Sequence, residues 1–189
     1  NLMNTKTKKL STVSMVLCGM FAALVAIGAF IQIPVPYRII SHFQFFFVLL
    51  AGLILGADKG AISVGCYVLL GLVGVPIFAA GGGIGYIFRP SFGYLVGFIV
   101  SAYITGKVCE KLKASYKNYL LACLAGFVVT YAIGIVYKFI ILNFYAHTPA
   151  TLGVIFLSCF PLDMPGDFVL CLLAAGVGLR MRKSGFYLS

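Results

Sequence analysis

Two carboxylates near the C-terminal end of the chain are the strongest candidates for binding chemistry. The chain has only four acidic residues, and Asp163 and Asp167 flank Pro165-Gly166 at the start of a predicted helix. A carboxylate at the edge of an apolar segment is a functional candidate by default. Asp167 could accept two hydrogen bonds from a ligand with adjacent N–H groups, or it could pair with Lys138. Asp163 could instead act as the N-cap of the predicted helix.

Cationic side chains are predicted at the same edge of the apolar segments. Arg89 precedes Pro90 at the start of a predicted helix, and its guanidinium could clamp a carboxylate through two hydrogen bonds or contact a lipid headgroup. Lys138 shares a helix face with Tyr131 and Gly134 by spacing. Its ammonium could bind a ligand or extend to the membrane interface.

A polar amide interrupts the aromatic run from Phe43 to Phe47. Because lipid offers no hydrogen-bond partner to the amide of Gln44, we expect this side chain to face protein or ligand. Phe43, Phe78 and Tyr86 could supply apolar walls beside it. Mostly apolar surface with a few convergent polar groups is typical of a small-molecule site.

No catalytic, nucleotide-binding or metal-binding pattern accompanies these residues. The run from Gly81 to Gly85 lacks the GK[ST] ending of a phosphate loop and any strand before it, so we interpret it as backbone for close packing. The six cysteines are scattered through apolar runs without CxxC spacing, which is typical of buried free thiols. We therefore expect no enzymatic activity, no metal and no cofactor.

The elements that must position these side chains belong in a membrane. The chain is 62% hydrophobic and 10% charged, whereas soluble domains are about 25% charged. The net charge of +10 could suggest nucleic acid, but the basic residues form short clusters beside apolar segments, which indicates lipid headgroups as the counter-charge. Three basic residues, Arg38, Arg89 and Lys138, fall on the predicted outer side. The other eleven of the fourteen Lys and Arg lie at the opposite ends of the segments, which predicts that those ends are cytoplasmic: Lys6, Lys8, Lys9, Lys59, Lys107, Lys111, Lys113, Lys117, Arg180, Arg182 and Lys183.

Six apolar segments approach the length of about twenty residues that a bilayer requires. They predict transmembrane helices over residues 13–33, 40–57, 60–75, 91–108, 119–142 and 165–179, with both termini cytoplasmic. Asp58-Lys59-Gly60 is the predicted turn between the second and third helices, and residues 152–160 are a candidate short helix in an outer loop. At 189 residues the chain is predicted to be one all-α membrane domain, residues 1–189.

Two further segments suggest roles in docking and gating. Ala22 and Ala26 form a small-xxx-small ridge that would let another helix approach closely, either within the bundle or from a partner protein. The predicted outer loop from Pro34 to His42 contains two prolines and several apolar residues. We expect it to act as a lid over a ligand.

The chain resembles the BioY family, whose members are biotin-specific substrate-binding components of energy-coupling factor (ECF) transporters. The resemblance rests on four segments that span nearly the whole chain: Gln32-Ile33-Pro34-Val35-Pro36, Gln44 with the following Phe-Phe-Val-Leu-Leu-Ala-Gly, Gly71 to Ala79, and Pro165-Gly166-Asp167. It implies the six-helix fold of a substrate-binding (S) component in a bacterial cell membrane. It also implies that biotin binds at the outer side, and that a transmembrane coupling protein and two ATPases are partners. The Ala22 and Ala26 ridge matches the motif through which such components are thought to dock.

One departure from the family pattern concerns the partner of the biotin carboxylate. The family has a lysine shortly after the Pro-Gly-Asp motif, where this chain has Phe168, Val169 and Leu170. This raises interest in Arg89 and Lys138 as alternatives. Two other classes of function stay open from the sequence: a stand-alone carrier or S component for another small solute, and a membrane scaffold or enzyme without solute transport.

Overall fold

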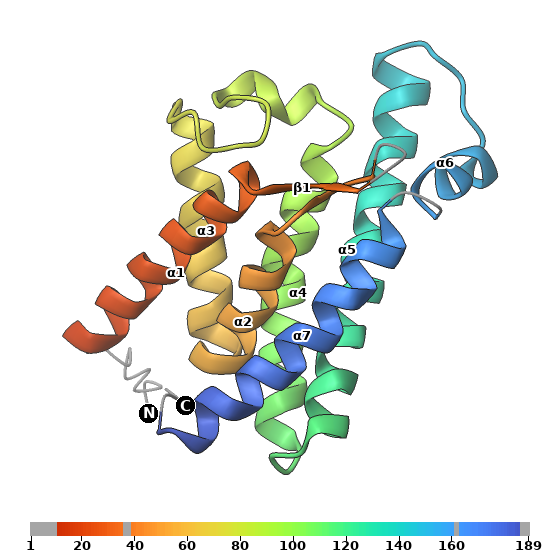
Figure 1. Cartoon of the computed structure of the whole chain (residues 1–189). Coiled ribbons are helices and arrows are strands. Elements are labelled where there is room, and N and C mark those ends of the chain that lie inside the picture. Colours follow the sequence, from red (N-terminus) through yellow and green to blue (C-terminus); the bar gives the residue numbers. More distant parts are fainter. Residues whose placement is uncertain (1–10, 36–38, 161–162, 186–189) are drawn as a thin grey trace, which may run out of the picture.

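A short apolar helix lies at the centre of the molecule. The computed structural model describes residues 11–35, 39–160 and 163–185. Every residue of α2 (Gln44–Leu55) apart from Phe47 is buried. This helix packs against α1 (Thr12–Phe30), α3 (Ala57–Val73), α4 (Phe92–Lys111), α5 (Tyr116–Ile140) and α7 (Met164–Lys183), as Figure 1 shows. The described chain is therefore a helical bundle wrapped around α2.

Four of these helices are long and apolar enough to cross a membrane. They are α1, α4, α7, and α5 together with the π-helical turn η2 (Ile141–Tyr145) that extends it. Helix α2 is apolar but shorter, and a further short helix, α6 (Leu152–Cys159), lies beside the end of α5 (Figure 1). The predicted helical architecture with apolar segments long enough to cross a membrane is confirmed, with four such helices among the described residues.

The boundary after the first helix differs from the prediction. Helix α1 ends at Phe30, whereas the sequence suggested a helix to Ile33. The following residues form a two-stranded antiparallel hairpin, β1 (Gln32–Val35) with β2 (Ile39–His42), in which Gln32 pairs with His42 and Val35 with Ile39. Proline cannot continue a helix because it lacks a backbone N–H, and a hairpin accommodates Pro34. Figure 1 shows the hairpin crossing one end of α2, and β2 contacts α1 and α7.

The turn between α2 and α3 is also displaced from the predicted position. Asp58, Lys59 and Gly60 are not a turn but belong to the first turn of α3. The chain reverses instead at Gly56, whose φ of 81° lies in the left-handed region that glycine tolerates without strain. The carboxylate of Glu110 on α4 accepts a hydrogen bond from the Ala57 N–H at 2.8 Å, and so satisfies one free donor at the start of α3.

The two ends of the bundle are built differently. One end holds the first turn of α1, the last turn of α7 and the connection from α4 to α5 (Figure 1). We call it the basic end because it contains Lys107, Lys111, Lys113, Arg180 and Lys183. At the opposite end, which we call the cavity end, the chain is less regular. A loop packs on α3 through the hydrogen bond from the Gly83 N–H to the Gly71 carbonyl at 2.7 Å, and a 3-10 helix, η1 (Ile84–Phe88), leads into α4.

Candidate functional site

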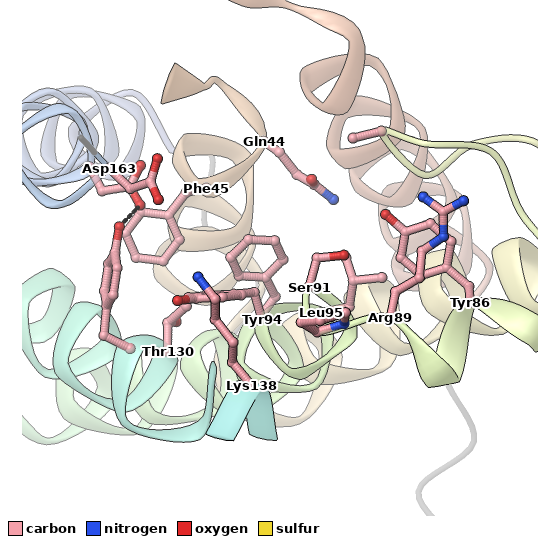
Figure 2. A pocket seen from close by; sticks show the side chains of 15 residues that line it. Gln44, Phe45, Tyr86, Arg89, Ser91, Tyr94, Leu95, Thr130, Lys138 and Asp163 are labelled. Atoms are coloured by element: carbon pink, nitrogen blue, oxygen red, sulfur yellow. Dashed lines mark hydrogen bonds between the residues drawn. The ribbon is translucent and has the colours of Figure 1, made fainter. Parts of the chain in front are cut away.

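A cavity of about 560 Å³ opens among α2, α4, α5 and α7 at the cavity end. Figure 2 shows its lining side chains. Six of the eight binding residues proposed from the sequence line it: Gln44, Tyr86, Arg89, Lys138, Asp163 and Asp167. The remaining lining residues are Phe45, Ala79, Pro90, Ser91, Tyr94, Leu95, Phe98, Thr130 and Tyr131. Residues that are far apart in the sequence therefore converge on one space.

A carboxylate held by a tyrosine forms one side of the cavity. The Tyr131 hydroxyl on α5 donates to Oδ2 of Asp167 on α7 at 2.7 Å, which Figure 2 marks with a dashed line. Asp167 lies in the first turn of α7, where the positive end of the helix dipole favours a carboxylate. One oxygen of Asp167 is thus engaged by Tyr131, and the pairing with Lys138 considered from the sequence is replaced by this bond.

Asp163 lies one helical turn before Asp167. It occupies the N-cap position of α7, but its side chain makes no capping hydrogen bond. Its side chain is exposed and lines the cavity. One helical turn joins the two residues, because the Asp167 N–H donates to the Asp163 carbonyl at 3.1 Å.

Two cations lie at different places along the cavity wall. The guanidinium of Arg89 lies 5.3 Å from the centre of the Tyr86 ring, a cation–π distance. Figure 2 shows Arg89 beside Tyr86 at the side of the cavity away from Asp163, and Lys138 lies between Asp163 and Arg89 in this view. The ammonium of Lys138 donates to the hydroxyl of Ser158 on α6 at 3.4 Å. Arg38, the third cation that the sequence places at this edge, lies outside the described residues.

Two buried polar atoms on the cavity wall lack ordinary hydrogen-bond partners within the described part of the chain. They are Nε2 of Gln44, whose residue is 5% exposed, and Oγ1 of Thr130, whose residue is 1% exposed. The Tyr67 hydroxyl donates to the Ile77 carbonyl at 3.1 Å, and its oxygen can at most accept one of the two N–H groups of the nearby Gln44 amide. Most buried polar atoms in proteins are paired, so these two groups are available to a ligand.

Aromatic rings fill the space between the polar groups. Phe45 stacks on Phe98 with ring centres 5.8 Å apart, and Tyr94 meets Tyr131 edge to face at the same separation. The two other aromatic residues proposed from the sequence do not line the cavity. Phe78 is 1% exposed and supports Tyr86 from behind with ring centres 4.6 Å apart, whereas Phe43 packs on Phe46.

The sequence interpretation missed four side chains that matter to the site. Tyr131 was placed on the helix face of Lys138 but not proposed as a binding residue, and Thr130 adjoins that face, so the spacing of α5 carried part of the signal. Tyr94 and Phe98 follow each other at i and i+4 along α4, but an aromatic pair at this spacing also predicts ordinary core packing. Only the packing of α4 against α2 and α5 shows that this aromatic pair lines a cavity and is not ordinary core.

The proposed docking ridge lies mostly inside the bundle. Ala22 is 7% exposed and belongs to the core, and Ala26 packs partly against it. Gly19 and Ala23 are instead the exposed small residues of α1, and a Cβ added at Gly19 would meet no atom within 4 Å. Of the proposed lid, residues 36–38 lie outside the described residues.

The arrangement suits recognition of an elongated ligand. An acceptor on Asp167 can bind N–H groups, aromatic rings can cover an apolar middle, and Arg89 or Lys138 can bind an anionic end. Among the described residues, no group of three or more His, Cys, Asp and Glu is placed to hold a metal ion.

Comparisons with known proteins agree with this picture. A sequence profile of the BioY family matches residues 3–185. The chain is 37% identical over 177 residues to the probable biotin transporter BioY of Lysinibacillus sphaericus, covering 93% of this chain and 90% of that protein. It is 37% identical over 172 residues to the biotin transporter BioY of Thermotoga maritima, covering 87% and 93%. A crystal structure of the S-component for biotin from an ECF-type ABC transporter has the same fold, with a TM-score of 0.78, 24% identity and coverage of 93% of each chain.

Proposed function

The chain belongs to the BioY family, and we propose that it is the biotin-binding subunit of an ECF-type vitamin uptake transporter in the cell membrane. The observation that carries this proposal is the cavity itself. It combines acceptors, aromatic walls and cations in one space, which matches the ureido ring, the apolar bicyclic body and the carboxylate of biotin. Such a protein transports its ligand without transforming it.

The ureido N–H groups pair with Asp167 in this proposal. The free oxygen of its carboxylate accepts one of them, and Tyr131 holds the other oxygen and fixes the orientation of the group. Asp163 adds negative charge nearby. A charged acceptor in a desolvated site forms stronger hydrogen bonds than a neutral one.

The biotin carboxylate pairs with a cation at the other side of the cavity. Arg89 is the better suited of the two candidates, because its guanidinium can form two hydrogen bonds with a carboxylate and lies over the Tyr86 ring, on the side of the cavity away from Asp163 in Figure 2. Phe168, Val169 and Leu170 stand where the family resemblance suggested a lysine, and none of them carries a charge. In this chain Arg89, with Lys138 beside the path of the alkyl chain, takes over that charge.

The membrane topology in this proposal has six spans. The short helices α2 and α3 join the four longer ones, and α6 lies at the membrane surface. The basic end faces the cytoplasm, as the excess of Lys and Arg predicts, and both termini lie on that side. Biotin then enters the cavity from the outside, and the β1–β2 hairpin covers it.

Delivery of biotin in this proposal uses the coupling protein and two ATPases that the family resemblance implies, and the chain itself carries no nucleotide-binding motif. We propose that the coupling protein docks on the exposed face of α1 around Gly19 and Ala23. Replacing Gly19 and Ala23 by Leu should leave biotin binding intact and abolish ATP-driven uptake in a reconstituted complex. The matched control is Ala22→Leu, which should destabilise the protein because Ala22 is buried. Normal uptake by the Gly19/Ala23 variant would exclude this face.

The direct test of the function is a calorimetric titration of the purified protein in detergent with biotin, thiamine and riboflavin. The proposal predicts tight binding of biotin alone. Preference for another vitamin would indicate an S component of different specificity. Binding with uptake in the absence of any ATPase would indicate a stand-alone carrier, and binding of none would favour a scaffold or enzyme.

A further inference from the structure

Thr130 has an unusual environment for a hydroxyl in the middle of a helix. The residue is 1% exposed, it lines the cavity, and its Oγ1 has no hydrogen-bond partner among the described residues. Threonine inside a helix can hydrogen-bond the carbonyl of the preceding turn, but Thr130 does not. An unpaired buried hydroxyl is destabilising, and valine would fill the same volume without that cost. The structure therefore keeps a polar atom on the cavity wall that its own packing does not use.

The groups around Thr130 indicate which ligand atoms could use it. Its neighbour Tyr131 donates to Oδ2 of Asp167 at 2.7 Å, so that carboxylate has one oxygen left and can only accept. Gln44 reaches in from the opposite side of the cavity (Figure 2), and its Nε2 carries two N–H donors for which the protein offers at most the Tyr67 hydroxyl. A ligand group that satisfies all three must combine N–H donors with an oxygen acceptor in a small space. A cyclic urea has this combination.

The position of Thr130 along α5 separates it from the cations. Lys138 follows eight residues later on the same helix, which places its Cα about 12 Å closer to the cavity end. On the facing helix, a Cβ at Gly97 would meet the Thr130 carbonyl oxygen at 3.0 Å, and Arg89 precedes the start of α4 at Phe92. Thr130 thus lies at the floor of the cavity, while the cations attach nearer its mouth.

We propose that the Thr130 hydroxyl hydrogen-bonds the ureido group of the ligand beside Asp167 and is a specificity-determining residue of the site. The inference rests on the proposed function, since it takes biotin as the ligand. Biotin then binds with its ureido ring at the floor and its carboxylate at the mouth. Thr130 is free in the empty protein because the ligand is its partner.

The test compares Thr130→Val with Ser101→Ala. Ser101 is a matched control because it is also fully buried, and its hydroxyl is likewise without a partner among the described residues, but it does not line the cavity. Dissociation constants for biotin and desthiobiotin, which keeps the ureido group and lacks the sulfur, would be measured by calorimetry. The melting temperature of each ligand-free variant would be measured alongside.

Thr130→Val should weaken both ligands equally, by roughly 5- to 20-fold, without lowering the melting temperature. Thr130→Ser should retain most of the affinity, and Ser101→Ala should bind as the parent does. Parental affinity in Thr130→Val would overturn the inference. A loss seen with biotin but not with desthiobiotin would also overturn it, because the hydroxyl would then contact the sulfur. Failure of the parent protein itself to bind biotin would refute the proposed function instead.

Discussion

The two ends of the bundle differ in how they use buried polar groups. Toward the basic end, buried hydroxyls bond to the protein itself: Ser63 donates to the Cys18 carbonyl at 2.7 Å, and Thr105 donates to the Ala122 carbonyl at 3.3 Å. On the cavity wall, Thr130 and Gln44 present buried polar atoms without ordinary partners, and among the described residues only Ser101 of α4, which does not line the cavity, has another such atom. The first arrangement stabilises the fold, whereas the second leaves donors and acceptors for a ligand.

Glycines allow close backbone contact at both ends, as at Gly28 against Gln44, but only the cavity end also leaves an open volume. At the basic end, small residues let backbones touch: a Cβ at Gly106 would overlap the backbone of Gly56 and Ala57, and one at Gly52 would approach the Ala102 carbonyl oxygen at 2.5 Å. At the cavity end, aromatic rings such as Phe98 and Tyr94 surround an open volume of about 560 Å³. Close packing stabilises the fold, whereas an open cavity lacks some of these contacts and provides space for a ligand. Mutations at the two ends should therefore change different measurable quantities.

The largest effect is expected at Asp167. Asp167→Asn removes the charged acceptor for the ureido group, which should cost about 2–4 kcal/mol of binding free energy, or roughly 30- to 700-fold in the dissociation constant. Calorimetric titration with biotin would measure it. Asp163→Asn is the control. Because Asp163 is exposed, this substitution should weaken biotin binding much less than Asp167→Asn does. Parental affinity in Asp167→Asn would show that the acceptor lies elsewhere.

A somewhat smaller loss is expected for the cation that binds the carboxylate. Arg89→Gln should weaken biotin by about 1.5–3 kcal/mol, the range for a hydrogen bond to a charged group. Biotin amide, which lacks the negative charge, should bind the parent weakly and should distinguish little between the parent and Arg89→Gln. The same pair of titrations on Lys138→Gln identifies the alternative. If neither variant reduces the difference in affinity between biotin and biotin amide, solvent or backbone groups bind the biotin carboxylate.

Substitutions at the basic end should lower the stability of the protein and leave its affinity for biotin unchanged. Gly106→Ala places a methyl group against the backbone of α3, and overpacking of this kind costs about 1–3 kcal/mol. The melting temperature should fall by roughly 3–10 °C, while the biotin affinity of the folded protein stays at the parental value. Gly19→Ala, at an open position on α1, is the control for adding a methyl group. A selective loss of biotin affinity at an unchanged melting temperature would contradict the division between the two ends.

The smallest expected effect is a change of motion in the hairpin that crosses α2. A spin label at Ser41, in a variant without the native cysteines, should become less mobile when biotin saturates the cavity, because closure would order the segment. Electron paramagnetic resonance measures this directly. Equal mobility with and without biotin would exclude the hairpin as the lid and would direct attention to the glycine loop between α3 and α4.

Much of the fold follows from the sequence because apolar length determines it. The segments that became α4, α5 and α7 were predicted to within a few residues, since a bilayer sets one requirement for all of them. The errors fell where local pairing decides the boundary. The hairpin shortens the first helix, and Gly56, with a positive φ, makes the turn that was expected at Asp58-Lys59-Gly60.

The site could be predicted only where chemistry is rare in such a chain. Asp167, Arg89 and Gln44 stand out because a polar residue in an apolar sequence is conspicuous. Thr130 does not, because threonine is common in membrane helices and its role depends on an unpaired hydroxyl that only packing reveals. Phe78 was expected on the wall for the opposite reason: one aromatic residue resembles another until the structure shows Tyr86 in front of it.

The orientation of biotin in the cavity is the central claim, and a crystal structure of the complex tests it most directly. The account predicts that the ureido ring lies within hydrogen-bond distance of Asp167 and Thr130, with the carboxylate near Arg89. A ligand bound the other way round, or outside this cavity, would contradict it.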